Sequence, residues 1–383
     1  EKAINCYEKA IEINPNYVNA YNNLGLTYNA FGKKRKAIEL YEKCIHIDSK
    51  NTDAHFNLGN VYKDLGDVEK SLDLFQKAIE IKPNINKHYN SILMSITYTH
   101  SNKNYLELAK KYYESIKIHE DKKFLYSKPR NNKILKVGFI SGDFKSHSVA
   151  NFLLDTIKNL REKNLELFAY SNSKADDATT KLLKQYFHNW TVIVNKPDRF
   201  VINLIRKDNL DVLFDLSGHS AGNRLRIFKS RCAPVQANWI GCASSTGINE
   251  IDYIIGDPYA TPLKDQYKFT EKIYNLNNIW SCLSTSNLYS DTKINKNNNK
   301  HITYGCFNNV FKINNNVISA WSKILNKVKN SKLFLKYPAY DNYDVRSNIH
   351  QKLNKHGIND EQIIFKGGKV PKSEFLEYYN KVD

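Results

Sequence analysis

The sequence predicts a solenoid of paired α-helices followed by two parallel α/β domains, the second incomplete, within 383 residues. Two observations lead to this fold class. Matching residues recur 34 positions apart over the first 85 residues, which is the period of a repeat made of two helices. From residue 134 onward, short apolar runs alternate with helical stretches, which indicates parallel sheets covered on both faces.

The repeat is clearest in AYNNLGLTYNAFG, which starts at Ala20, and AHFNLGNVYKDLG, which starts at Ala54. Small residues recur where two helices would cross, and aromatic residues recur where they would fill the gaps. This is the tetratricopeptide (TPR) pattern, and its first unit contains only the second helix. We expect TPR repeats over 1–85, which would form a concave groove of the kind that usually holds peptides.

Asn23 and Asn57 occupy equivalent positions in these two segments, just before a Leu-Gly pair. A primary amide offers both a donor and an acceptor, so a column of asparagines could bind a peptide backbone without reading its side chains. A solvated helix surface is the alternative explanation, and the residues alone leave both open.

Residues 86–133 are expected to contain helices that cap the repeats, followed by a linker. Helical spacing continues to about residue 119, whereas the segment 120–133 is charged and contains Pro129, which is typical of a linker. The first α/β domain is expected over 134–285. Its strands are expected at 135–141, 167–172, 191–194, 211–218, 235–241 and 253–256.

A polar segment of low complexity over 286–300 is expected to be a loop between the two α/β domains. The second domain is expected over 301–383. Its strands are expected at 302–308, 333–338 and 362–368. Val382 and Asp383 resemble the opening of one more strand, and the chain begins inside a repeat, so we expect a fragment truncated at both ends.

Two histidines follow strands of the first α/β domain, and ligands of such domains bind beyond the carboxyl ends of the strands. His147 lies where a strand meets a helix, in GDFKSHSVANF, and His219 follows the strand that ends in DLSG. A histidine can act as a base or donate to phosphate near neutral pH. For a lone histidine such as His147, a helix cap or a plain surface position is the alternative explanation.

The segment GCFNNVFKI ends the first strand of the second domain and brings two amides and one cation to its edge, namely Asn308, Asn309 and Lys312. This set suits an anionic diphosphate, because lysine is a positive charge that needs no bidentate geometry. Helix capping by asparagine is the alternative explanation. The loop 239–247 lacks both the GxGxxG spacing and the Walker lysine, which disfavours NAD binding and P-loop hydrolysis. Physics alone therefore suggests a two-domain glycosyltransferase.

The net charge is +18, from 57 basic and 39 acidic residues. Lysines are spread along the whole chain, so we expect no specific nucleic-acid partner. No apolar run reaches the roughly 18 residues that a membrane span needs. The six cysteines form no CxxC pair, so no metal site is expected, and their scatter indicates a reducing compartment, the cytoplasm or the nucleus.

Together, the TPR units and the segments GDFKSHSVANF, DLSGHSAGNRL, APVQANWIGCASSTG and YGCFNNVFKI resemble the SPINDLY and O-GlcNAc transferase family, glycosyltransferase family 41. The likeness covers nearly the whole chain, in the same order. It implies a GT-B architecture of two Rossmann-like domains behind a TPR superhelix. It also implies transfer of a sugar from a nucleotide donor to Ser or Thr hydroxyls of proteins, with inversion and without a metal or other cofactor.

The resemblance implies a role for each matched residue. His147 would line the active site, although its assignment as the base is contested within the family. Lys312 would hold the donor diphosphate and steady the leaving group, with Asn308 and Asn309 beside it. His219 would belong to the same donor-binding set.

Two further matches refine the resemblance. Asn309 stands where O-GlcNAc transferases carry Gln, and His219 stands where they carry Tyr, so both residues favour the SPINDLY-like branch. Asn23 and Asn57 match the asparagine ladder that binds the acceptor peptide, so protein substrates would lie in the TPR groove.

The resemblance leaves the donor open. UDP-GlcNAc is the lead donor, and GDP-fucose, used by plant members of the SPINDLY branch, is the alternative. A non-catalytic TPR adaptor that only binds peptides is a second alternative. Because the segments that read the donor base and sugar are expected beyond residue 383, we expect this piece alone to be inactive.

Overall fold

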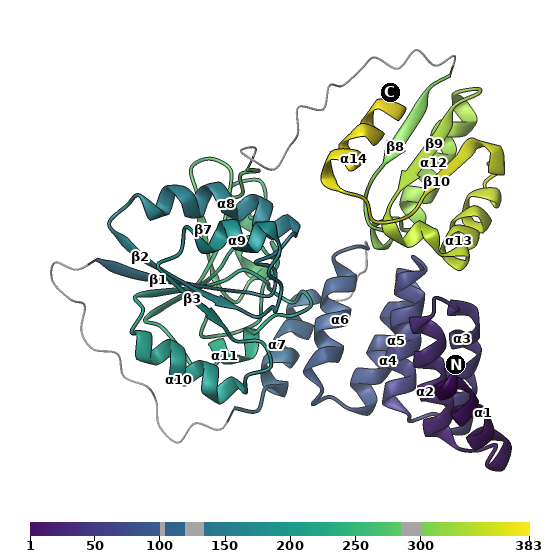
Figure 1. Ribbon diagram of the computed structural model, residues 1–383, viewed down its shortest axis with the longest axis horizontal. Coiled ribbons are helices and arrows are strands. Elements are labelled where there is room, and N and C mark those ends of the chain that lie inside the picture. The colour runs from purple at the N-terminus through teal and green to yellow at the C-terminus, as the bar shows by residue number, and fades with distance from the viewer. Residues whose placement is uncertain (100–103, 119–133, 285–300) are drawn as a thin grey trace. The chain divides into compact units, whose positions relative to one another are not determined.

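The computed structural model describes residues 1–99, 104–118, 134–284 and 301–383 (Figure 1). These residues form two compact units. The first unit contains the N-terminal helices and the C-terminal sheet, and the second contains the central sheet with the helices just before it. The linkers predicted at 120–133 and 286–300 lie outside the described residues.

The N-terminal helices form antiparallel pairs, as the 34-residue period predicts. Each pair crosses at a glycine: a Cβ atom on Gly25 would lie 2.7 Å from the ring of Tyr41, and one on Gly59 would lie 2.7 Å from the ring of Phe75. The repeats therefore need a hydrogen at these positions for the helices to approach. The helices are α1 (Lys2–Ile13), α2 (Val18–Ala30), α3 (Lys34–Ile47), α4 (Thr52–Asp64) and α5 (Val68–Ile81).

Two helices follow the repeats, α6 (Asn86–Ile96) and α7 (Tyr105–Ser115). The side chain of Asn104 caps α7 by accepting a hydrogen bond from the N–H of Glu107. Helix α6 takes part in both units, because Tyr89–Met94 belongs to the second unit. In the second unit, α7 packs against the central domain: Lys229 Nζ donates to the carbonyl oxygens of Tyr113 and Ile116, both at 3.0 Å.

The central domain of the second unit is a parallel sheet with strand order β3-β2-β1-β4-β5-β6-β7. The order reverses between β1 and β4, and ligands of such sheets bind at this switch point, beyond the carboxyl ends of the strands. The strands are β1 (Leu135–Ser141), β2 (Leu165–Ser171), β3 (Asn189–Val192), β4 (Val212–Asp215), β5 (Val235–Asn238), β6 (Tyr253–Gly256) and β7 (Lys272–Asn275). Strand β7 is absent from the sequence prediction.

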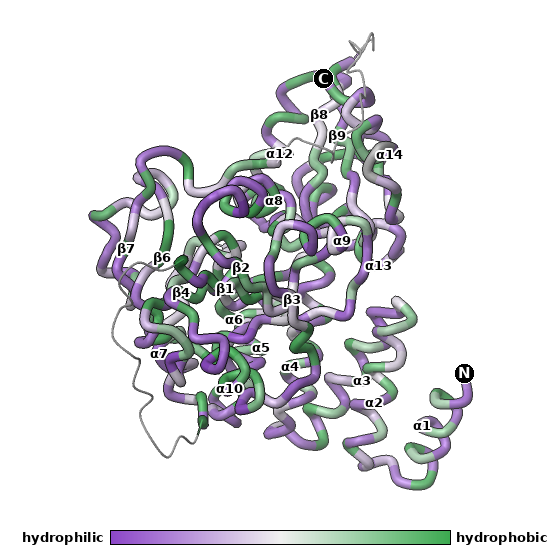
Figure 2. Tube along the Cα trace, turned by 60° about the vertical axis from the view of Figure 1, so that its left-hand side comes forward, coloured by the Kyte–Doolittle hydropathy of each residue, from purple (hydrophilic) through white to green (hydrophobic). Residues whose placement is uncertain are grey.

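Amphipathic helices cover this sheet on both faces, with α8 and α9 on one face and α10 and α11 on the other (Figure 1). Strands β1 and β2 are buried from their third residue onward, as expected for a parallel sheet that is covered on both faces, and Figure 2 shows the hydropathy along them. The helices are α8 (Ser148–Arg161), α9 (Ala178–Lys184), α10 (Asp198–Asp208) and α11 (Leu225–Phe228).

The C-terminal domain of the first unit has a parallel sheet with strand order β10-β9-β8. Val382 is extended, and the N–H of Asp383 donates to the carbonyl oxygen of Thr303 at 3.0 Å, so the last residues lie along the free edge of β8. The elements are β8 (Thr303–Cys306), α12 (Asn315–Lys327), β9 (Lys332–Lys336), α13 (Tyr343–Asn354), β10 (Ile363–Lys366) and α14 (Lys372–Glu377).

Within the first unit, the C-terminal domain packs directly on the repeats. One hydrophobic cluster contains Leu65 of the repeats together with Val310 and Ile349 of the C-terminal domain. Around it, Asn342 Nδ2 donates to the carbonyl oxygen of Gly32 at 2.7 Å, and Lys352 Nζ donates to that of Gly66 at 3.0 Å. Gly32 and Gly66 end equivalent helices of successive repeats, so the repeat period also sets the spacing of these contacts.

The predicted order, helical repeats followed by two parallel α/β domains, is thus confirmed. Across the described ranges, no helix is both long enough and apolar enough to cross a bilayer.

Candidate functional site

His147 lies at the switch point of the central sheet, between β1 and α8. It is the N-cap residue of α8, with extended backbone angles, and its Nδ1 accepts a hydrogen bond of 3.3 Å from the N–H of Val149. Its side chain is 42% exposed, and Nε2 has no partner among the described residues. In a neutral ring whose Nδ1 accepts, Nε2 carries the hydrogen, so this atom offers a donor to a ligand.

Asp143 is a neighbour that the sequence analysis did not single out. Its Oδ2 lies 3.6 Å from His147 Nδ1, and its Oδ1 lies 3.8 Å from the ammonium of Lys145. Asp143 is buried, and its N–H donates to the hydroxyl of Ser141. The sequence could have indicated this neighbour, because Asp143 lies four residues before His147 in the same segment after the strand.

The loops after β1 and β4 touch each other beside His147. A Cβ atom on Gly142 would lie 2.9 Å from the carbonyl oxygen of Gly222, so this approach requires glycine. The guanidinium of Arg224, two residues after Gly222, is held by contacts within the domain. It forms an ion pair with Asp198 at 2.6 Å and donates hydrogen bonds to the carbonyl oxygens of Ile193 and Lys196. Arg224 therefore fixes the loop after β4 and has little freedom to bind a phosphate.

His219 also lies at the switch point, after β4, but it is buried. Its Nδ1 lies 2.9 Å from the amide oxygen of Asn90, and its Nε2 lies 3.0 Å from the carbonyl oxygen of Thr246. The ring of Tyr112 packs edge-on against it at 4.9 Å, and burial lowers the pKa of His219 to about 3. Both ring nitrogens are occupied, so this placement favours a structural role over the donor-binding role predicted from the sequence.

Asp215, at the end of β4, is a second residue that the sequence analysis did not single out. It is fully buried, and burial raises its pKa to about 7. Its Oδ2 accepts from the N–H of Gly218 and from Nδ2 of Asn238, both at 2.7 Å, whereas Oδ1 has no partner among the described residues. The carboxyl group therefore holds the turn before His219 and links β4 to β5.

Asn308, Asn309 and Lys312 follow β8 in the first unit. Lys312 Nζ lies 3.5 Å from the Oδ1 atom of Asn308, and both side chains are exposed. Asn309 Oδ1 caps the short 3₁₀ turn Val310–Lys312 by accepting from the N–H of Phe311 at 3.2 Å. The capping alternative thus applies to Asn309, yet its NH2 group has no partner among the described residues and can donate to a ligand.

Lys312 and His147 occupy corresponding positions in the two sheets. Each follows the first strand of its sheet, β8 or β1, and each lies six residues beyond the last residue of that strand, Cys306 or Ser141. Because each residue follows the carboxyl end of a strand in a parallel sheet, each side chain belongs to the carboxyl edge where ligands of such sheets bind.

Asn23 and Asn57 lie at equivalent, half-buried positions on α2 and α4. Asn57 Nδ2 donates to the Oδ1 atom of Asn22 at 3.0 Å, which links one repeat to the next. The two predicted peptide-binding residues therefore share one side of the stack, with Asn22 as a neighbour that the sequence analysis did not include. Over the described ranges, no three His, Cys, Asp or Glu side chains are grouped as metal ligands would be.

Sequence comparison agrees with this architecture. The sequence model of glycosyl transferase family 41 matches residues 76–295 and 283–378. TPR models match residues 1–32, 28–66 and 52–85.

Two plant proteins illustrate the likeness. A probable UDP-N-acetylglucosamine–peptide N-acetylglucosaminyltransferase SPINDLY from Solanum lycopersicum is 30% identical, over 62% of this chain and 26% of its own length. A protein of the same enzyme name, SEC, from Arabidopsis thaliana is 26% identical over 61% of this chain and 25% of its own length. This chain thus spans about a quarter of the length of these curated relatives.

Among solved structures, a mutant of the Thermobaculum terrenum O-GlcNAc transferase has the same fold. It is 24% identical, with a TM-score of 0.83 over 98% of this chain and 72% of that one. The family model covers both sheets and every candidate residue that follows their strands, which is well over half of the sequence. The chain therefore belongs to glycosyl transferase family 41.

Proposed function

We propose that this chain carries the TPR and catalytic portions of a protein O-glycosyltransferase, which moves a sugar from a nucleotide donor to Ser or Thr hydroxyls with inversion. The observation that most supports this proposal is the group formed by Lys312, Asn308 and Asn309. A cation and two amides gather at the carboxyl end of the first strand of a parallel sheet, in a chain whose family transfers sugars.

The chemistry follows from where charge develops. As the glycosidic bond breaks, negative charge accumulates on the departing nucleotide diphosphate. Lys312 supplies a positive charge, and Asn309 supplies an amide N–H, so both stabilise the transition state more than the ground state. In this proposal the lysine and amides suffice for the diphosphate, and no metal ion or other cofactor is required.

In this proposal, His147 donates a hydrogen bond to an oxygen of one of the two substrates. Its Nδ1 is engaged by the N–H of Val149, so a neutral ring directs Nε2–H outward. Such a group orients an acceptor or donor oxygen, and it does not remove a proton. The proton of the attacking hydroxyl then leaves through water or donor oxygens.

The acceptor protein binds in the groove of the repeats, where Asn23 and Asn57 present their amides on one side of the stack. The nucleotide sugar binds at the α/β domains. Scattered cysteines favour action in a reducing compartment, the cytoplasm or the nucleus.

UDP-GlcNAc is the proposed donor, because SPINDLY and SEC relatives carry that substrate in their names. GDP-fucose remains the alternative. The buried position of His219 bears on this choice. Its two ring nitrogens contact Asn90 and Thr246, so a histidine at this position is explained by packing and does not distinguish UDP-GlcNAc from GDP-fucose.

The test uses the complete polypeptide that carries this chain, with UDP-GlcNAc or GDP-fucose and a Ser/Thr-rich peptide, followed by peptide mass. A mass gain of one N-acetylhexosamine supports the lead donor, and a gain of one deoxyhexose supports GDP-fucose. Lys312→Ala should reduce transfer by roughly a hundredfold or more. Lys323→Ala, which removes an exposed lysine from the middle of α12, is the matched control and should leave the rate unchanged.

Two results would contradict the proposal. Peptide binding with no mass gain from either donor would support the non-catalytic adaptor. Normal transfer by Lys312→Ala would show that the diphosphate is held elsewhere.

A further inference from the structure

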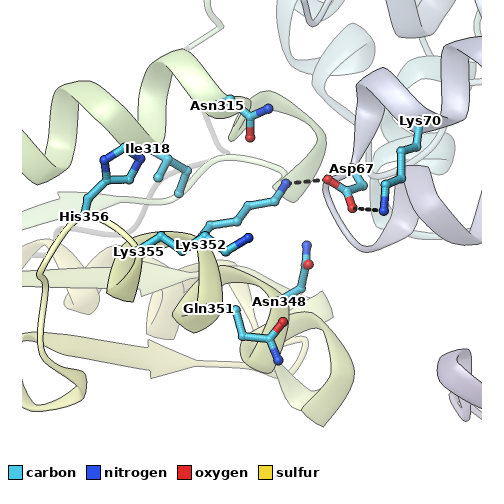
Figure 3. A pocket seen from close by; sticks show the side chains of 9 residues that line it. All are labelled: Asp67, Lys70, Asn315, Ile318, Asn348, Gln351, Lys352, Lys355 and His356. Atoms are coloured by element: carbon cyan, nitrogen blue, oxygen red, sulfur yellow. Dashed lines mark ion pairs between the residues drawn. The ribbon is translucent and has the colours of Figure 1, made fainter.

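A polar cavity of about 390 Å³ lies within the first unit, where the start of helix α5 faces helices α12 and α13 (Figure 3). Lys70 and Asp67 line it from the repeats, and Lys352, Lys355 and Asn315 line it from the C-terminal domain. None of these residues belongs to the group around Lys312 or to the asparagine ladder, so the cavity is separate from the site of the proposed function.

The cavity has an excess of positive charge. Asp67 is its one carboxylate, and it is shared: Lys352 Nζ lies 2.8 Å from its Oδ1 atom, and Lys70 Nζ lies 3.8 Å from its Oδ2 atom. Lys355 is exposed and has no ion-pair partner among the described residues. Three ammonium groups and one carboxylate give the lining a net charge of about +2, which an anion with about two negative charges would neutralise.

The arrangement of the helices brings these charges together. Lys352 lies in the last turn of α13, and Lys355 is the helical C-cap residue three positions later, so the two lie on the same face. Asn315 is the first residue of α12, where the unpaired N–H groups of a helix favour negative charge. Lys70 reaches the cavity from the first turn of α5.

The lining also limits what the anion can be. Among the residues that line the cavity, Ile318 is the single apolar side chain, and the only ring is the imidazole of His356, with no Phe, Tyr or Trp on which a nucleobase could stack. The volume falls at the small end of ligand cavities, which span roughly 300–1,000 Å³. Ammonium groups are point charges that suit phosphate oxygens.

We infer that this cavity binds a small phosphorylated molecule without an aromatic ring, and that the bound phosphate bridges helix α5 of the repeats to helices α12 and α13. The bridge would add to contacts already present there, because Lys352 donates to the carbonyl oxygen of Gly66 and Asn348 donates to that of Leu65 at 2.7 Å. Occupancy would therefore stiffen the junction between the repeats and the second α/β domain.

The affinity test is calorimetric titration of the protein with inorganic phosphate, pyrophosphate and a hexose phosphate at low ionic strength. The double variant Lys70→Gln/Lys355→Gln should weaken binding at least about tenfold, because two charge-assisted contacts are lost. Lys323→Gln/Lys327→Gln removes the same charge from α12 outside the cavity and should leave the affinity unchanged.

The three probes separate the sources of the phosphate. Tighter binding of the hexose phosphate than of pyrophosphate identifies a phosphorylated sugar, and the reverse order identifies free phosphate or pyrophosphate. Failure of all three probes to bind, equal losses in the two double variants, or no loss in the first would each overturn the assignment.

Two further measurements address the bridge and its independence. Amide hydrogen exchange in α5 and α13 should slow when the best probe is added, and unchanged exchange in both helices would overturn the bridging role. Lys312→Ala should keep full affinity for that probe. If Lys312→Ala abolishes binding, the phosphate is bound at the donor site and the separate cavity is not a ligand site.

Discussion

His219 and Asn90 join helix α6 to the loop after β4 through their side chains, with Nδ1 and Oδ1 2.9 Å apart. A neutral His219 ring donates from Nε2 to the carbonyl oxygen of Thr246, so its Nδ1 must accept. The Asn90 amide meets this need when its NH2 group takes the place of its oxygen beside Nδ1, since the two ends of a side-chain amide have nearly the same shape. Thr246, His219 and Asn90 then form one buried chain of hydrogen bonds, against which the ring of Tyr112 packs.

Breaking this chain should destabilise the second unit. We expect His219→Ala to lower the free energy of unfolding by about 3 kcal/mol, because it opens a cavity and leaves buried polar atoms without partners. A double-mutant cycle with Asn90→Ala should give a coupling of about 1 kcal/mol, measured by urea unfolding. Weaker binding of the nucleotide sugar at unchanged stability would instead support the donor-binding role of His219.

Gly247 is a second point at which helix α7 meets the central domain. It has a φ of +74°, and a Cβ atom there would overlap the backbone of Ala109. Gly357 has a similar φ of +80° with nothing within 4 Å of its added Cβ, so it is a matched control for backbone strain alone. We expect Gly357→Ala to cost about 1 kcal/mol and Gly247→Ala to cost at least about 3 kcal/mol in urea unfolding. Equal costs would show that α7 moves aside freely.

The sequence predicted the parts of the fold that depend on local pattern. The 34-residue period located the repeats, because each unit must present small and aromatic residues at fixed places to pack on its neighbours. Strand β7 was missed because Lys272–Asn275 has only one buried residue, Ile273, and therefore carries no apolar run. An edge strand of this kind is identified by its partner β6, which the sequence alone does not reveal.

The same distinction separates the candidate site residues. Lys312 and Asn308 are four residues apart on one loop, so the segment itself brings them together. The surroundings of His219 come from Asn90, Thr246 and Tyr112, which are distant in sequence, so its burial could not be foreseen. Asp143 and Asp215 were overlooked for a related reason. Each is distinguished by being buried in contact with another polar group, and a sequence does not show burial.

His88 should make the stability of the first unit depend on pH. Burial, aided by the charge of Lys87, lowers the pKa of His88 to about 4, whereas a histidine in the unfolded chain titrates near 6.5. The folded state therefore resists protonation, so this contribution is complete above pH 6.5 and is lost as the pH falls towards 4. Its slope is about 1.4 kcal/mol per pH unit within that window.

The variant His88→Phe keeps the ring beside Phe56 and removes this titration, so its free energy of unfolding should fall less steeply between pH 6.5 and 4.5. His46→Phe, at an exposed position, is the control and should keep the original slope. Asp215 acts in the opposite direction, because its raised pKa favours the folded state as the pH falls below 7. Comparison of the two variants cancels that contribution, and identical slopes would contradict the prediction.

The asparagines of the repeats should affect the acceptor peptide and not the chemical step. We expect Asn23→Ala and Asn57→Ala each to raise the KM for a peptide acceptor about threefold to tenfold with little change in kcat, because each amide contributes one or two hydrogen bonds to the peptide backbone. Asn60→Ala is the control on α4, since Asn60 donates to the carbonyl oxygen of Phe56 and accepts from Lys63. A drop in kcat with unchanged KM would argue against peptide binding by the ladder.

His147 offers a test that separates a helix cap, a hydrogen-bond donor and a general base. Asparagine is among the best N-cap residues and also presents an N–H donor, but it cannot accept a proton near neutral pH. We therefore expect His147→Asn to keep the stability of the wild type and to retain transfer within about tenfold. His147→Ala should lose about 1 kcal/mol of stability with the cap and should lose more of the rate.

The pH profile decides between the remaining roles of His147. If its ring only donates from Nε2, the acidic limb of the transfer rate should be the same in the wild type and in His147→Asn. A general base would give a different outcome, because its loss removes the limb and lowers the rate by about 100-fold to 10,000-fold. That result would mean that Nδ1 gives up the N–H of Val149 and the ring turns during the reaction, with Asp143, 3.6 Å away, stabilising the protonated ring.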